Sequence, residues 1–270
     1  MDEREKYDNG IFTVRFVGEE LKTRGVSIYD LSNSLLAIQR IVHKAFLSQE
    51  GRLVKGAFPD KEERERLALQ IGERRRTSDG FSLVSILSDP AVQDYLKQLA
   101  GYIISSVVGY YTCDVLDRLR REKDINKKIF ICSIHTEITN IVNRVNSSGG
   151  VEAISLGSPA LERETFASFN QDSKDYLRSL NGEFVLGDYA EIKGRAYKLY
   201  PASRIVAIHG EKGRAISVFL DEDNFDKIRY HKESNPLFVF KGRARYPFGV
   251  ETTYISEFEA YEIEYLVEES

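Results

Sequence analysis

The residues best suited to chemistry are basic and aromatic side chains in the last third of the chain. In the segment FVFKGRARYPF, residues 238–248, Lys241, Arg243 and Arg245 alternate with small or apolar residues. Side chains two positions apart on a β-strand share one face. Such a face contacts phosphates while nearby aromatic rings stack on bases, as in proteins that bind single-stranded nucleic acid. The full candidate set is Arg195, Tyr197, Arg204, Lys241, Arg243, Arg245 and Tyr246.

The charge of the surrounding region opposes that interpretation. Residues 181–270 hold 12 Lys plus Arg and 16 Asp plus Glu, so the region is acidic. Phosphate binding favours a basic domain. We therefore keep single-stranded nucleic-acid binding as an alternative function, because a solvated strand face also explains the basic stripe.

Two short patterns contain residue types that bind metals. Cys132 and His135 have a useful spacing, but a zinc site needs four ligands, and the other cysteine, Cys113, stands alone. Glu191-Ile192-Lys193 matches the end of a metal-dependent nuclease motif, which also needs a carboxylate on a neighbouring strand. We predict no metal site, no cofactor and no catalytic residue. A metal-dependent hydrolase with an unrecognised site is the second alternative.

An uncharged run from Gln98 to Cys113 contains the segment GYIISSVVGYY. A helix that spans a membrane needs about 20 apolar residues, and this run of 16 is flanked by charges on both sides. Stable membrane insertion is therefore not expected. Within the run, Gly101, Ser105 and Gly109 recur every four residues, so on a helix they form one smooth stripe.

That stripe predicts a close helix–helix contact, because small residues let a second helix approach. Each glycine costs about 1 kcal/mol of helix propensity relative to alanine, so the contact must compensate. Two interpretations remain open: the helix is the centre of the N-terminal core, or the stripe is a seam for self-association.

The local patterns place these residues on recognisable elements. We expect a strand over residues 11–17, helices over about 27–49, 88–123 and 126–145, and a hairpin over 67–87 that turns at residues 78–80. Asp89 and Pro90 suit the start of the second of these helices. The C-terminal strands are expected at EIKGRAYKLY, RIVAIHG, AISVFLD, PLFVFKGRARY and TTYISEFEAYEIEYL, with a helical turn, NFDKI, between the third and fourth.

These elements predict a two-domain α+β protein. The first domain, residues 1–150, carries long helices on a small antiparallel sheet, and Ser147-Ser148-Gly149-Gly150 marks its end. Residues 151–180 are expected to connect it to a small β-barrel over residues 181–270. The order of strands and helix is that of an OB-like barrel, and an SH3-like barrel is the rival.

Composition bounds the setting in which the protein works. Two cysteines in 270 residues exclude a disulfide framework, and the charged N-terminus lacks the apolar stretch of a signal peptide. We expect a cytoplasmic bacterial protein whose partner is itself, another protein, or both.

The patterns F-x-V-R-F-x-G, YDLSNSLLAIQRIVHKAF and DGFSLVSIL precede an apolar helix and a small C-terminal barrel. In this layout the chain resembles uncharacterised bacterial two-domain proteins found near mobile-element and phage-defence genes. The resemblance implies a component of antiviral defence and assigns no catalytic residue. The leading hypothesis is thus a non-enzymatic, oligomerising or adaptor component that acts through protein–protein contacts.

Overall fold

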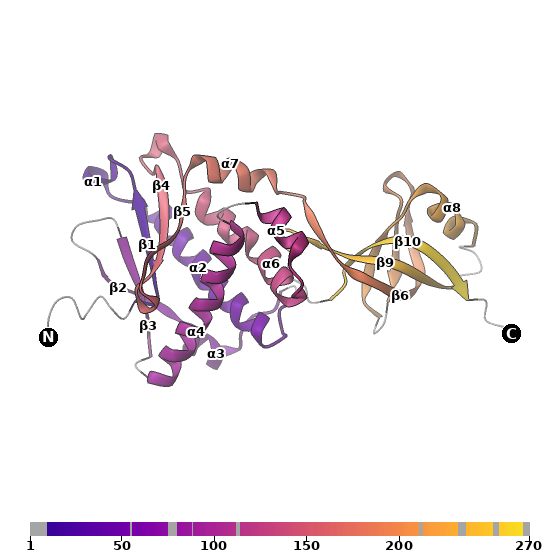
Figure 1. Ribbon diagram of the computed structural model, residues 1–270, viewed down its shortest axis with the longest axis horizontal. Coiled ribbons are helices and arrows are strands. Elements are labelled where there is room, and N and C mark those ends of the chain that lie inside the picture. The colour runs from indigo at the N-terminus through magenta and orange to yellow at the C-terminus, as the bar shows by residue number, and fades with distance from the viewer. Residues whose placement is uncertain are drawn as a thin grey trace. The chain divides into compact units, whose positions relative to one another are not determined.

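A computed structural model describes residues 10–54, 56–74, 80–87, 89–111, 114–210, 213–231, 236–250 and 254–266 (Figure 1). The chain forms two compact units. The N-terminal unit contains Met1–Glu183 and Phe248–Glu251, and the C-terminal unit contains Phe184–Pro247 and Thr252–Ser270. Both helices and strands are present, which confirms the predicted α+β class.

The N-terminal unit is built on one five-stranded antiparallel sheet in the order β2-β3-β1-β4-β5. Residues 151–180, expected as a connection, supply two of its strands and a helix, so this unit extends to Glu183, beyond the boundary expected near residue 150. The predicted hairpin is present as β2 and β3, and most of its turn lies outside the described residues. The strands are β1 (Phe12–Val17), β2 (Leu69–Arg74), β3 (Gly80–Ser85), β4 (Ala153–Ser158) and β5 (Arg163–Phe169).

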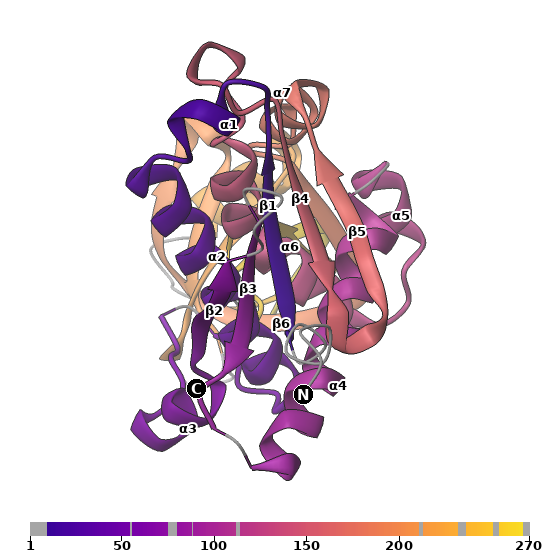
Figure 2. The ribbon, with the colours of Figure 1, turned by 90° about the vertical axis from the view of Figure 1, so that its left-hand side faces the viewer.

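Helices α2, α4 and α6 cover one face of this sheet (Figures 1 and 2). Alternation along β1 explains why: Phe12, Val14 and Phe16 are buried, whereas Arg15 and Val17 are exposed. The helices are α1 (Leu21–Arg24), α2 (Ile28–Gln49), α3 (Lys61–Leu67), α4 (Pro90–Ser106), α5 (Val115–Arg121), α6 (Ile125–Val142) and α7 (Gln171–Ser179).

Side chains at the helix starts fix where α2 and α4 begin. The Ser27 hydroxyl accepts a hydrogen bond from the Asp30 N–H at 3.0 Å, which caps α2. The Asp89 carboxylate accepts from the Ala91 N–H at 2.9 Å, and Pro90 occupies the first turn of α4. These caps satisfy backbone donors that a helix leaves unpaired, and the expected roles of Asp89 and Pro90 are confirmed.

The helix expected over residues 88–123 is not continuous. Regular α-helix ends at Ser106, a π-helical segment covers Val107–Tyr111, and α5 follows at a bend of 115°. The Tyr111 hydroxyl donates to the Ile131 carbonyl at 2.6 Å, and the Tyr110 hydroxyl donates to the Glu122 carboxylate. That hydrogen bond lowers the pKa of Glu122 to about 2. The π segment therefore ends in two anchored tyrosines.

No single helix in the described part of the chain has the length and apolarity needed to cross a bilayer. Pro90–Tyr111 and Val115–Arg121 meet that test only when they are joined as a bent pair.

An ion pair lies in the core between α2 and α6. The Lys44 ammonium donates to the Glu137 carboxylate at 2.6 Å and to the Ser133 carbonyl at 2.7 Å. Their side chains are 9% and 5% exposed. Because a buried charge is costly unless it is paired and hydrogen-bonded, each of these two groups requires the other.

A short return of the chain completes the N-terminal unit. After β9 the backbone N–H of Phe248 donates to the Glu183 carbonyl at 3.0 Å, and that of Gly249 donates to the Cys132 carbonyl at 2.8 Å. The Phe248 ring is buried and lies 5.0 Å, centroid to centroid, from the His135 ring on α6. Phe248 and Gly249 thus pack with the N-terminal unit although they follow a strand of the C-terminal unit.

Five strands of the C-terminal unit pair in a closed ring, β10-β8-β7-β6-β9. All pairs are antiparallel except β8 with β10, which is parallel. Strand β6 begins at Phe184 rather than at Glu191 as expected, and α8 lies between the third and fourth strands as expected. The elements are β6 (Phe184–Tyr200), β7 (Ile205–His209), β8 (Ala215–Phe219), α8 (Glu222–His231), β9 (Leu237–Pro247) and β10 (Glu257–Leu266).

Candidate nucleic-acid interface

The basic stripe on β9 faces an acidic stripe on β10. Cross-strand register sets Arg245 opposite Glu257, Arg243 opposite Glu259 and Lys241 opposite Glu262. Directly opposite side chains lie on the same face of a sheet and interact. The predicted face is therefore present, but carboxylates on the next strand offset its positive charge.

Two of the three basic residues are engaged by specific partners. The Lys241 ammonium donates to the Glu264 carboxylate at 2.5 Å, and this hydrogen bond raises the pKa of Lys241. The Arg245 guanidinium lies 3.6 Å from the ring centroid of Phe184 and 3.8 Å from that of Phe219, and it pairs with Glu257 at 3.7 Å. With 16% of its side chain exposed, Arg245 serves packing rather than phosphate contact.

Tyr246 and Arg204 do not join the β9 stripe. Tyr246 is 8% exposed, and a Cβ added to Gly187 would lie 2.9 Å from its ring, so the tyrosine packs against β6. Arg204 lies in the turn between β6 and β7 with φ +52°, and its guanidinium is 4.0 Å from the Glu222 carboxylate. Neither residue provides a stacking platform beside β9.

The remaining predicted residues, Arg195 and Tyr197, form a second surface on β6 and β7. The Tyr197 ring stacks on the His209 ring with centroids 4.1 Å apart and planes 20° from parallel. Tyr197 occupies a bulge in the β6–β7 pairing and is 47% exposed. Register sets Arg195 opposite His209, so a cation adjoins an exposed aromatic pair.

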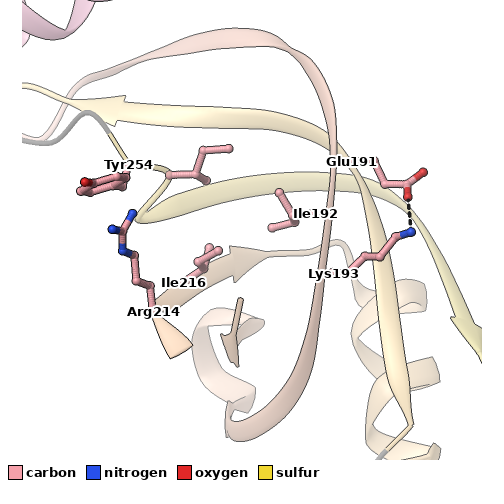
Figure 3. Close-up of a pocket in the computed structure, with 7 residues that line it drawn as sticks. Glu191, Ile192, Lys193, Arg214, Ile216 and Tyr254 are labelled. Atoms are coloured by element: carbon pink, nitrogen blue, oxygen red, sulfur yellow. Dashed lines mark ion pairs between the residues drawn. The ribbon is translucent and has the colours of Figure 1, made fainter. Parts of the chain in front are cut away.

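A cavity of about 490 Å³ lies between β6, the start of β8 and the segment before β10. The Arg214 guanidinium covers the Tyr254 ring at 3.2 Å from its centroid, and Ile192 and Ile216 provide apolar wall (Figure 3). Ala215 pairs with His209, so Arg214, the residue before it, points to the opposite face of the sheet and lies with Ile216. The cavity combines a flat cation, an aromatic ring and apolar walls.

The nuclease-like pair, Glu191 and Lys193, also lines this cavity. Glu191 and Lys193 lie on the other side of β6 from Ile192 (Figure 3) and form an ion pair with each other at 3.2 Å. Within the described residues no group of three or more His, Cys, Asp or Glu side chains is placed to hold a metal ion.

Cys132 and His135 are buried on α6, which belongs to the N-terminal unit and not to the unit that holds the candidate interface. Burial raises the pKa of the Cys132 thiol to about 12 and lowers the pKa of His135. A thiol held in its neutral form is a poor metal ligand. The His135 ring packs between the rings of Tyr111 and Phe248.

The small-residue stripe on α4 and the π segment faces outward. A Cβ built on Gly101 or on Gly109 meets no other heavy atom within 4 Å among the residues that the structure describes. Ser105 is exposed, and its hydroxyl donates to the Tyr102 carbonyl of its own helix. Val108, beside the stripe, is 38% exposed. The described residues thus leave room beside the stripe for an added side chain, although the Arg118 guanidinium donates to the Gly109 carbonyl.

Sequence reasoning did not single out His209, Arg214 or Tyr254 for this surface. Each lies outside the β9 segment, and the β6–β7 register alone brings His209 opposite Arg195. Comparisons with protein-family models, with curated proteins and with solved structures gave no match to this chain.

Proposed function

We propose that the C-terminal unit is an OB-like barrel that binds single-stranded nucleic acid across β6, β7 and β8. Support for the OB-like assignment comes from the strand order, in which the third and fifth strands pair in parallel and a helix follows the third. OB-folds bind oligonucleotides on the face of their second and third strands. Those strands are β7 and β8 here.

The observation that carries this proposal is the exposed Tyr197–His209 stack with Arg195 opposite it. Bases stack on such aromatic platforms whatever their sequence, and basic side chains follow the phosphates. The acidic stripe of β10 lies opposite β9 and not opposite β6, which permits binding by a unit that is acidic in total. The proposed surface lies on β6, β7 and β8, on other strands than the β9 stripe that the sequence indicates.

We expect a short single-stranded oligonucleotide to bind with strong salt dependence. Arg195 and Lys198 are two exposed cations of β6 for about two phosphates, so log K should fall with log salt at a slope of about −1.4. Tyr197→Ala should weaken binding about 5- to 100-fold, because stacking on one base contributes about 1–3 kcal/mol. Fluorescence polarisation with labelled oligo-dT and oligo-U at low salt measures both quantities.

A matched pair of variants separates the two basic surfaces. Arg195→Gln and Arg243→Gln remove the same charge from exposed strand positions, and we expect the first to weaken binding about tenfold while the second changes it little. Equal effects of the two variants, or no binding by the unmodified protein at low salt, would contradict the β6–β7–β8 site.

A second candidate function, assembly through the α4 stripe, is favoured by the open space at Gly101 and Gly109. Two outward glycines weaken a helix without any benefit to the packing of the described residues. A second helix of another copy or of a partner protein supplies the compensating contact. A role in phage defence is a further prediction that accompanies this adaptor hypothesis.

Gly101→Leu tests the assembly hypothesis. Because no atom of the described chain lies within 4 Å of that Cβ position, we expect the folded stability to stay the same or rise by up to about 1 kcal/mol. If the stripe is a seam, the mass from light scattering should fall from that of an assembly to that of one chain. A wild-type protein that is monomeric at high concentration, or a variant with unchanged assembly, would eliminate the seam.

A further inference from the structure

A second cavity lies in the N-terminal unit. It has a volume of about 570 Å³ and lies between the end of α2, α3 and the start of α4. Pockets of about 300–1,000 Å³ hold small molecules in other proteins. Its walls are largely apolar, and they include Phe46, Leu67, Leu87, Val92 and Tyr95.

Two aromatic rings form one wall of this cavity. Phe46 and Tyr95 pack edge to face with centroids 6.3 Å apart. The Arg52 guanidinium lies over the Phe46 ring at 5.8 Å from its centroid, so a cation already occupies a position against this wall. Aromatic faces attract cations because their π electrons are negative.

Carboxylates dominate the rim. Glu50, Glu63 and Asp89 line the cavity together with a single basic residue, Arg66. The Glu63 carboxylate accepts two hydrogen bonds from Arg52, at 2.6 and 3.2 Å, which lower its pKa.

The rim has a negative charge that its own cations do not offset. Arg66 is paired with Glu62 at 2.6 Å. Among the described residues Glu50 and Asp89 have no ion-pair partner, and Asp89 accepts only the capping hydrogen bond from Ala91. A cavity of one sign with low-dielectric walls concentrates ligands of the opposite sign.

From this arrangement we propose that the cavity binds a small organic cation with an apolar body. The apolar body packs against Phe46, Val92 and Tyr95, and the ammonium or guanidinium group lies at the rim near Glu50 and Asp89. Anionic ligands such as nucleotides are disfavoured by the same carboxylates. The cavity rim is acidic and the proposed nucleic-acid surface of the C-terminal unit is basic, so the two sites select ligands of opposite charge. The two proposals are independent of each other.

Three matched probes test the charge preference: 4-phenylbutylamine, 4-phenylbutanol and 5-phenylpentanoate, which share one phenylbutyl body. Titration calorimetry or ligand-observed NMR on the full chain measures their affinities. We expect the amine to bind with a dissociation constant on the order of 1 mM or below. It should exceed the carboxylate in affinity by about tenfold, with the alcohol between them. Equal affinities for the three probes, or no saturable binding, would overturn the proposal.

Variants locate the probe. Glu50→Gln should reduce the preference for the amine over the alcohol, whereas Glu65→Gln, the same change at an exposed position of α3 that does not line the cavity, should not. Val92→Trp fills the cavity and should weaken all three probes while the protein stays folded by circular dichroism. Retained binding in Val92→Trp, or equal effects of the two glutamine variants, would place the probe elsewhere.

A basic side chain of a protein partner offers the same chemistry as a free amine, so one further probe distinguishes the sources. A blocked phenylalanyl-lysine dipeptide carries an apolar ring and an ammonium on a peptide backbone. Weaker binding of this dipeptide than of 4-phenylbutylamine supports a free small molecule. Tighter binding of the dipeptide would overturn that assignment in favour of a protein side chain.

Discussion

Replacing Lys44 with methionine should lower the free energy of unfolding of the N-terminal unit by about 3–5 kcal/mol, because it leaves a buried carboxylate without its partner. Glu137 lies 2.6 Å from the ammonium and is 5% exposed, so water cannot replace the lost charge. The Ser133 carbonyl also loses the hydrogen bond that it accepts from Lys44. Urea unfolding followed by circular dichroism measures the change.

The double variant Lys44→Met/Glu137→Leu separates the charge from the packing. Well-packed apolar residues in place of a buried pair are often neutral or stabilising, so most of the lost stability should return. Lys97→Met is the matched control, because its pair with Asp94 is exposed and spans 3.8 Å, and exposed pairs contribute about 0–1 kcal/mol. A double variant as unstable as Lys44→Met would show that shape, not charge, dominates at this position.

Gly242→Ala should disrupt the C-terminal sheet, with an expected loss of about 3 kcal/mol or more from overpacking. The added Cβ would lie 2.0 Å from the Glu259 carbonyl oxygen and 2.8 Å from the Ala260 Cα. Both are backbone atoms of β10 beside its bulge, so they cannot move aside as a flexible side chain does. Loss of the β9–β10 pairing opens the ring of strands.

Hydrogen exchange in β9 and β10, together with urea unfolding, tests this second expectation. Gly101→Ala is the control, because the same added methyl group there meets open space and removes a helix-weakening glycine. The two glycine-to-alanine changes should therefore act in opposite directions. Native-like exchange protection in Gly242→Ala would show that β10 can shift to admit a methyl group.

Local signals in the sequence are sufficient for much of this fold. The apolar spacing of three and four in α2 predicts a helix that the structure places at Ile28–Gln49. Alternation of apolar and polar residues predicts the strands of the C-terminal unit, and α8 lies where the helical turn is expected. These features depend on neighbours within a few residues.

Features that depend on distant pairing are not predictable in this way. Strands β4 and β5 have small and polar residues, as in AISLGS and RETFASF, and become strands by pairing with β1 and with each other. The β9 stripe is visible in sequence, but the glutamates that oppose it follow from the β9–β10 register. For the same reason the sequence indicates the β9 stripe directly, whereas the Tyr197–His209 stack follows only from the pairing of β6 with β7.

The return of Phe248 and Gly249 to the N-terminal unit bears on whether the two units are separable modules. A polypeptide cut after Glu183 would lack the ring that packs on His135 and the N–H that caps the Cys132 carbonyl. In this polypeptide the surface of α6 around His135 would lose the cover that Phe248 provides. A fragment or a chimera that contains the N-terminal unit would therefore have to include Phe248–Glu251 as well as residues 1–183. The two units cannot be exchanged between proteins by a single cut in the sequence.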